Sequence, residues 1–214
     1  MRRPALLSTA TTCAAGILLL ATGCGSKPTG EDTSPIDVSL PPAQTAILNP
    51  GAIRLEGAGY EFVITPLAQY VLRGIVVSRE NYRTGWNASL SPCDVAMAWG
   101  ELAAGDGWHK LAWSQSGRWY YWRWHGEQPF TNALVAKNSS NTHIVPASPN
   151  LARAAKSLAP GDIAELTGDL VRIDGRRGQE KVWWVSSLSR NDTGDGSCEL
   201  LYLRRLRVNG KVYE

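Results

Sequence analysis

Three residue types that could together perform thiol chemistry are spread along the chain. Cys198 could supply a nucleophile, His143 a base and Asp94 an acid that orients the imidazole. The thiolate is the reactive form of cysteine, so this chemistry needs an imidazole within hydrogen-bond reach of the sulfur. Most proteins of this length contain all three types, however. We favour the alternative in which Cys198 is buried or bridged, His143 is a hydrogen-bonded loop residue and Asp94 caps a helix.

A run of aromatic residues at 119–125 is the feature most typical of a ligand-binding surface. Alternation along a strand puts Tyr120, Trp122 and Trp124 on one face, and Trp119, Tyr121, Arg123 and His125 on the other. The polar members indicate that the second face is wet. Trp119 and Tyr121 could stack on sugar rings or on a partner protein, with Arg123 beside an anionic group. Packing against a neighbouring loop or helix is the alternative use of such large side chains.

The stretch 191–196 has oxygen-bearing side chains at alternate positions, as calcium loops do. An EF-hand loop needs an acid at its twelfth position, and counting from Asn191 gives Tyr202. The chain also has only three histidines and no cysteines at zinc-ligand spacing. We therefore expect no metal and no cofactor.

The first residues of the chain indicate where the protein is located in the cell. Arg2 and Arg3 precede a short apolar stretch that ends in small residues, as in a signal peptide. The run 18–24, LLLATGC, resembles a bacterial lipobox, in which Cys24 becomes the lipidated first residue. Two or more acyl chains make membrane attachment stable. Because Gly25 rather than aspartate follows the cysteine, the resemblance implies the periplasmic side of the outer membrane in a Gram-negative host and the cell membrane in a Gram-positive one.

Two cysteines remain in the domain, Cys93 and Cys198. An even pair in an oxidising compartment favours a disulfide between them. The alternative is a reactive thiol at Cys198, since spacing alone does not place two cysteines within bridging distance.

Charge and composition divide the chain into three parts. We expect a signal peptide over 1–23, a flexible lipidated tether rich in proline and polar residues over 24–46, and one globular domain over 47–214. Removal of the signal lowers the formal net charge from +3 to about +1, because Arg2 and Arg3 leave with it. The domain is nearly neutral, which argues against a nucleic-acid partner. Its one basic concentration consists of Arg176, Arg177, Arg204, Arg205 and Arg207.

Many short strands separated by glycine turns predict a mainly β (α+β) fold, either a small antiparallel sheet or an OB-like, partly open barrel. Ser-Pro starts at 91 and 148 predict two short helices, running to about Trp99 and Leu158. The predicted strands are 60–65, 70–78, 110–115, 118–125, 163–167, 170–174, 181–188 and 199–208, with a hairpin turn at Asn209-Gly210.

Four stretches together resemble a family of uncharacterised bacterial envelope proteins. They are SPCDVAMAWG at 91–100, HIVPA at 143–147, GDIAELTGDLV at 161–171 and SSLSRNDTGDGSCE at 186–199. The resemblance spans about Tyr60 to Val208. The family has no established activity, so it supplies no catalytic residue. Its members often carry an apolar residue at the position of Cys93, which implies that a disulfide is not a general need of the fold.

These observations lead to one expected function and one alternative. We expect a lipid-anchored, non-enzymatic module that binds an envelope protein or a cell-wall glycan through Trp119, Tyr121 and Arg123. The alternative is a thiol-dependent hydrolase or transferase that uses Cys198 and His143, with Asp94 as the orienting acid.

Overall fold

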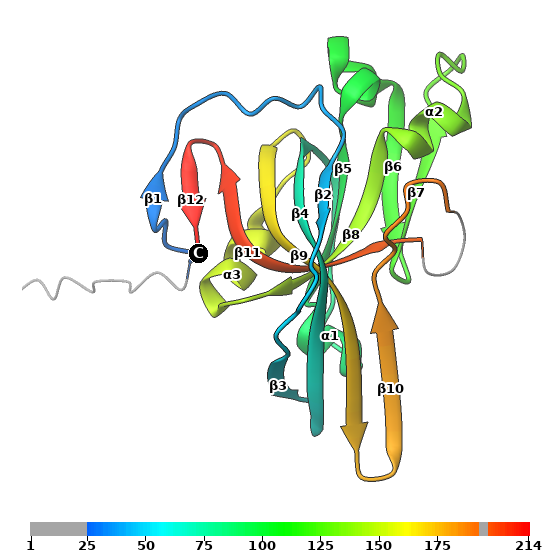
Figure 1. Cartoon of the computed structure of the whole chain (residues 1–214). Coiled ribbons are helices and arrows are strands. Elements are labelled where there is room, and N and C mark those ends of the chain that lie inside the picture. The colour runs from blue at the N-terminus through cyan, green and yellow to red at the C-terminus, as the bar shows by residue number, and fades with distance from the viewer. Residues whose placement is uncertain (1–24, 193–196) are drawn as a thin grey trace, which may run out of the picture.

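The computed structural model describes residues 25–192 and 197–214 (Figure 1). Its strands are β1 (Gly30–Glu31), β2 (Ala43–Ala46), β3 (Ile53–Gly57), β4 (Tyr60–Asn81), β5 (Cys93–Ala98), β6 (Leu111–Ser116), β7 (Trp119–Trp124), β8 (Ser139–Pro146), β9 (Ile163–Arg177), β10 (Glu180–Val185), β11 (Glu199–Val208) and β12 (Lys211–Tyr213). Its helices are α1 (Trp86–Leu90), α2 (Asn132–Lys137), α3 (Pro149–Ser157) and the 3-10 turns η1 (Gly100–Leu102) and η2 (Ala104–Lys110). The mainly β (α+β) class is confirmed.

Five strands of the large sheet close into a ring. Going around it, β4 pairs with β5, β5 with β8, β8 with β11, β11 with β9, and β9 with β4 again. The β8–β11 pair is parallel and the other four pairs are antiparallel. The sheet is therefore mixed, and it is larger than the small antiparallel sheet that was one of the two expectations.

Strand β4 links the ring to a second part of the sheet. It runs for 22 residues, where the sequence predicted two separate strands. Its register with β9 shifts between Pro66 and Ala68. Proline lacks a ladder N–H and is tolerated at such bulges, so Pro66 marks an irregularity rather than a strand end. The part of β4 before Pro66 pairs with β3 and β9, and with β10 these strands form the extension at the bottom of Figure 1.

The ring encloses the main hydrophobic core, and α3 packs against it. Leu72, Val95, Met97 and Leu166 belong to this core, as does Leu151 on α3. Ser148 caps α3, since its hydroxyl accepts a hydrogen bond from the Leu151 amide at 3.2 Å. The helix predicted after Ser148 is thus confirmed, and its buried face is tied to the ring.

The other predicted helix is wrong, because Cys93–Ala98 is strand β5. All six of its residues are buried, and the strand lies between β4 and β8. A short apolar run buried on both faces is typical of a central strand, and such burial overrides a local capping signal. Ser91 is itself buried and does not cap a helix: its oxygen atoms accept hydrogen bonds from Arg118.

A small hairpin of β6 and β7 covers the outer face of β5. Its strands were predicted at nearly these positions, and the turn between them lies at Gly117 and Arg118. Tyr120 and Trp122 of this hairpin pack with buried Ala96 and Ala98. One face of the aromatic strand is therefore attached to the ring, which determines where its other side chains lie.

Residues 25–46 pack along the domain, which differs from the expected flexible tether. Strand β1 pairs with β12, and β2 pairs with β4. The Lys27 amide donates to Asn150 at 2.8 Å, and Gly100 donates to the Val38 carbonyl at 2.8 Å. Backbone pairing satisfies this segment, so its polar, proline-rich composition does not make it a free linker.

Candidate functional site

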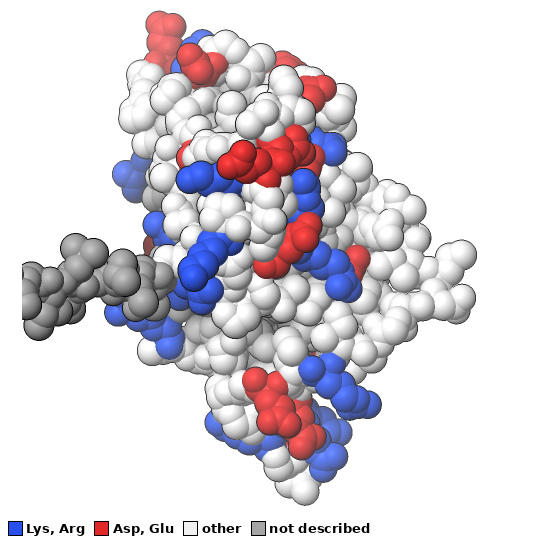
Figure 2. All heavy atoms as spheres, turned by 90° about the vertical axis from the view of Figure 1, so that its left-hand side faces the viewer, with Lys and Arg blue, Asp and Glu red and all other residues white. Residues whose placement is uncertain are grey.

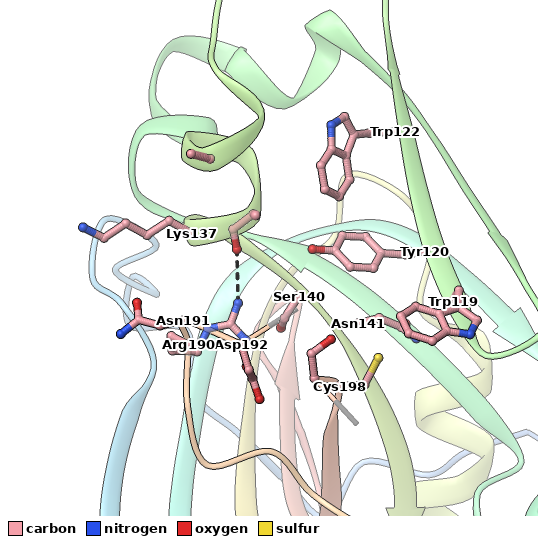
Figure 3. Close-up of a pocket in the computed structure, with 13 residues that line it drawn as sticks. Trp119, Tyr120, Trp122, Lys137, Ser140, Asn141, Arg190, Asn191, Asp192 and Cys198 are labelled. Atoms are coloured by element: carbon pink, nitrogen blue, oxygen red, sulfur yellow. Dashed lines mark hydrogen bonds between the residues drawn. The ribbon is translucent and has the colours of Figure 1, made fainter. Parts of the chain in front are cut away.

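The candidate site is a cavity of about 490 Å³ at the start of β8, bordered by β7, α2 and the loop before β11, which we call the main cavity (Figure 3). Its aromatic wall comes from β7 and consists of Trp119, Tyr120 and Trp122. Its polar lining includes Lys137, Ser140, Asn141, Arg190 and Asp192. A wall of ring faces opposite polar groups is the usual composition of a small-molecule site.

The β6–β7 turn positions the aromatic wall. Arg118 has a φ of 74°, and the preceding Gly117 a φ of 59°, as tight hairpin turns require. The Arg118 guanidinium lies 3.7 Å from the centre of the Tyr82 ring, and its backbone carbonyl accepts from Asn141 at 2.9 Å. These contacts tie the start of β7 to β4 and β8, so that Trp119 borders the cavity.

Arg190 forms the polar floor of the main cavity together with the buried carboxylate of Glu199. Its guanidinium donates to Glu199 Oε1 and to the carbonyl oxygens of Ser139 and Ala136, at 2.7 and 3.3 Å respectively. Burial raises the pKa of the Glu199 carboxyl, while Arg190 and the nearby Ser140 hydroxyl act to lower it. The pair holds the loop after β10 against β8 and α2.

A second, smaller cavity of about 250 Å³ adjoins the first, and Trp119 and Cys198 line both. We call it the histidine cavity, because His143 lies in its wall with Arg118, Trp183 and Trp184. His143 also contacts the Trp184 ring, with 4.7 Å between the ring centres. The two cavities thus share a boundary at Trp119 and Cys198.

Asp94 and His143 meet beside the histidine cavity, as the thiol alternative requires. They are register partners on β5 and β8, and His143 Nδ1 lies 3.0 Å from Asp94 Oδ2 without the alignment of a hydrogen bond. The other carboxylate oxygen, Oδ1, accepts from Arg118 at 2.7 Å. Asp94 is thus a buried ion-pair partner, and it does not cap a helix.

Cys198 lies in the same cavity but is not an activated thiol. Burial, together with the carboxylates of Glu199 and Asp94, raises the pKa of Cys198 to about 12. A thiol with this pKa carries almost no thiolate at neutral pH. The structure therefore places Cys198 and His143 in the wall of one cavity, with Asp94 in contact with His143 and the pKa of the thiol raised.

The structure corrects the disulfide prediction, because Cys93 and Cys198 are both free thiols. Cys93 packs inside the ring among core residues. The next residue on β5, Asp94, faces outward, and Cys198 lines the two cavities. Strand alternation on β5 thus puts the Cys93 side chain on the face away from Asp94 and the cavities, and the two cysteines are not bridged.

The three predicted ligand-binding residues separate in the structure. Trp119 borders both cavities, whereas Tyr121 is 50% exposed and lies with Arg123 along a shallow depression on the hairpin. Most of the expected division of faces is present: Tyr120, Trp122 and Trp124 pack towards the ring, and Tyr121, Arg123 and His125 are exposed. Trp119, which was expected on the exposed face, is partly buried. It is the packed face, through Tyr120 and Trp122, that contributes to the main cavity.

The arginines of β11 are paired with carboxylates. Arg204 contacts Asp169 at 2.7 Å, and Arg205 contacts Glu165 at 3.0 Å. Arg207 contacts Asp32 at 3.0 Å. Figure 2 shows the result on the side of the molecule that carries β1 and β12, where basic and acidic side chains are interspersed. This face has no continuous basic surface.

No metal site is apparent in the described parts of the chain: no three His, Cys, Asp or Glu side chains are grouped to hold an ion. Residues 193–196 of the calcium-like stretch lie outside the described residues, as does Cys24. Asp192 accepts a hydrogen bond from the Ser187 hydroxyl at 2.5 Å, the local bonding that a turn residue makes.

Sequence reasoning missed several residues of the main cavity. Strand β8 begins Ser-Ser-Asn, a polar run with little strand propensity, and was not predicted, so Ser140 and Asn141 went unnoticed. Arg190 appeared in the sequence analysis only as part of the 186–199 stretch. Lys137 lies at the end of α2, and it was missed because no helix was predicted there.

None of the helices in the described residues is long and apolar enough to cross a membrane. Comparison with known proteins found no matching family model, no matching curated protein and no matching solved structure.

Proposed function

We propose that this protein is a non-enzymatic binding module of the bacterial cell envelope, which holds a cell-wall glycan in the main cavity. The observation that carries the proposal is the placement of Trp119, Tyr120 and Trp122 opposite the polar floor of Ser140 and Arg190. Sugar units have apolar faces and hydroxyl-bearing edges, so they suit such a wall and floor. Aromatic stacking contributes about 0.5 to 1.5 kcal/mol for each contact.

The volume of the cavity suits a small ligand unit such as a sugar. About 490 Å³ falls within the range of small-molecule sites. OB-type folds bind oligosaccharides or oligonucleotides over their second and third strands. The second and third strands of this ring are β5 and β8, and the cavity lies at the start of β8. This is an analogy of architecture and supports the proposal only in that respect.

Co-sedimentation of the full-length protein, kept in detergent, with insoluble cell-wall material tests the proposal. We expect Trp119→Ala to weaken binding about three- to tenfold, the loss of one aromatic contact. Tyr121→Ala is the matched control, because it removes an exposed aromatic ring from the same strand outside both cavities. Equal loss in both variants, or no binding by the wild type, would contradict a glycan site here.

Thiol-dependent catalysis by Cys198 and His143 is the second candidate, favoured by the 3.0 Å contact of His143 with Asp94. Because the pKa of Cys198 is raised, we favour the binding function over catalysis. Selective labelling of Cys198 by a thiol probe at pH 7, abolished by His143→Ala in a folded protein, would reverse this order.

We also propose that Cys24 carries the lipid and tethers the module to the outer membrane on its periplasmic side. Strand β1 and the β6–β7 hairpin lie at opposite sides of the ring (Figure 1), so an anchor before β1 would leave the cavity facing away from the membrane. Metabolic labelling with a fatty-acid analogue should mark the wild type and not Cys24→Ala. Equal labelling of both would contradict the anchor.

A further inference from the structure

The histidine cavity has walls of indole rings. Trp86, Trp119, Trp183 and Trp184 line it, four of the nine tryptophans in the chain. Trp86 and Trp184 meet edge to face with 6.1 Å between their ring centres, and both pack against the core cluster that contains Phe62. These two rings are thus held in place by the fold itself. The walls therefore offer fixed apolar ring surface to a small group that contains a methyl or methylene carbon.

Two polar atoms in the same wall have no partner among the described residues and can be reached. The Arg118 guanidinium donates through its two terminal nitrogens to Asp94 and Ser91, but its Nε makes no hydrogen bond there. His143 Nε2 makes none either, while the other ring nitrogen, Nδ1, faces Asp94. Nδ1 is sealed from solvent, whereas Arg118 Nε and His143 Nε2 keep accessible surface. Since both side chains line the cavity, a ligand inside it can bond to these two atoms.

The two atoms differ in their hydrogen-bonding role. Arg118 Nε always carries a proton, so it donates. The Asp94 carboxylate lies 3.0 Å from His143 Nδ1 and favours the ring proton there, which leaves Nε2 as an acceptor in the neutral ring. The wall therefore combines a donor, an acceptor and indole surface. An acetamido group has the complementary set, which is a carbonyl, an N–H and a methyl group.

The charges around the histidine cavity disfavour an ionic ligand group. Among the described residues that line it, Arg118 alone has a fixed charge, and the fully buried Asp94 carboxylate compensates that charge at 2.7 Å. The Cys198 thiol is neutral, because burial raises its pKa to about 12. A carboxylate or an ammonium group would leave water without meeting a free counter-charge, which is costly, whereas an amide carries no charge to compensate.

From these observations we infer that the histidine cavity is a subsite for the acetamido group of an N-acetylated amino sugar. The acetamido carbonyl accepts from Arg118 Nε, its N–H donates to His143 Nε2, and its methyl group packs on the indole rings. Because the two cavities share Trp119, one glycan chain can place a sugar ring in the main cavity and this group in the histidine cavity. The inference rests on the proposed function and specifies the class of glycan.

Calorimetric titration of the full-length protein, kept in detergent, tests the inference with the soluble tetramers of N-acetylglucosamine, glucose and glucosamine. We expect the N-acetylglucosamine tetramer to bind about three- to tenfold more tightly than the other two, the value of one hydrogen bond. His143→Phe keeps a ring beside Trp184 but removes the acceptor, so it should abolish this preference and leave the affinity for the glucose tetramer unchanged. His125→Phe, the same change at an exposed histidine outside both cavities, is the matched control and should change nothing.

Trp183→Ala gives a second measurement if thermal unfolding shows that His143→Phe does not fold. Trp183 is 66% exposed, and it lines the histidine cavity but not the main cavity. Its removal should reduce the preference for the N-acetylglucosamine tetramer without affecting the glucose tetramer.

Each result separates this inference from the proposed function. Equal affinity of the wild type for the N-acetylglucosamine and glucose tetramers, or tighter binding of the glucosamine tetramer, overturns the acetamido subsite. A preference that survives both substitutions also overturns it, as does tighter binding of N-acetyl-alanyl-alanine, which would indicate a peptide ligand instead. If no tetramer binds while the protein still sediments with cell-wall material, the subsite is wrong and the glycan-binding function stands. If neither occurs, both are wrong.

Discussion

The Cys198 thiol gives a direct chemical test of its surroundings. With a pKa of about 12, its reaction with iodoacetamide should be very slow at pH 7 and rise about tenfold for each pH unit through pH 9.5, without reaching a plateau. Peptide mapping by mass spectrometry separates Cys198 from buried Cys93. In denaturant both thiols should react with the ordinary pKa of about 8.5. A plateau near pH 7 in the folded protein would indicate an activated thiolate and revive the enzyme alternative.

Asp94 is the residue whose loss should damage the fold most among the site residues. Its carboxylate is fully buried and compensates Arg118, which is also mostly buried. Removing one partner of a buried ion pair leaves an uncompensated charge, so Asp94→Ala should lower the free energy of unfolding by about 3 to 5 kcal/mol. Urea denaturation measures the change. Asp174→Ala breaks a half-exposed pair with Arg172 and should cost far less; similar losses would mean that Asp94 is not a structural ion-pair residue.

The sequence identified which site residues have suitable chemistry, but it did not predict most of the contacts that they make. The sequence identified Asp94, His143 and Cys198 as chemically capable, and the first two do meet across β5 and β8. It could not reveal that Cys93 faces the interior, because that depends on treating 93–98 as a strand. The wet face of 119–125 was identified correctly, whereas the side chains that border the cavity come mostly from the packed face.

At the level of elements, helix-start and turn motifs predicted the structure correctly where the following residues were not buried on both faces. Ser148-Pro149 and Asn209-Gly210 lie near the surface, and the predicted helix and hairpin turn are both present. Ser91-Pro92 carries the same kind of signal, but the next six residues are buried between two strands. Whether 93–98 forms a helix or a strand depends on its pairing with β4 and β8, and a single sequence does not reveal which distant segments pair.

The ring of strands depends on close approach between β9 and β11. A side chain at Gly168 would overlap the carbonyl oxygen of Tyr202 on the neighbouring strand. Gly168→Ala should therefore separate the two strands and destabilise the protein by about 1 to 3 kcal/mol, the usual cost of overpacking. Gly51→Ala is the control, since nothing lies within 4 Å of its added methyl group. Equal unfolding midpoints for the two variants in urea would contradict the proposed closeness of the strands.

At the scale of the whole molecule, residues 25–46 connect the proposed anchor to the ring, and Asp32 holds them. Asp32 accepts from the Ser34 hydroxyl and amide at 2.6 and 3.1 Å and contacts Arg207 at 3.0 Å. The Ser34 hydrogen bonds, and less strongly the Arg207 charge, lower the pKa of Asp32 below 3.8. A carboxyl with a lowered pKa contributes stability above its unfolded pKa, and this contribution is lost as the pH falls through the folded value.

This segment should therefore detach in acid before the ring unfolds. We expect the Thr29 and Asp32 amides, which donate to Val212 and Gly210, to lose hydrogen-exchange protection below about pH 3.8, after correction for the intrinsic exchange rate. The Val76 amide inside the ring should stay protected over the same range. In Asp32→Asn the two amides should exchange faster already at pH 7 and lose this acid transition. If their protection in the wild type stays constant down to pH 2, backbone pairing alone holds the segment, and the orientation of the module on the membrane does not depend on Asp32.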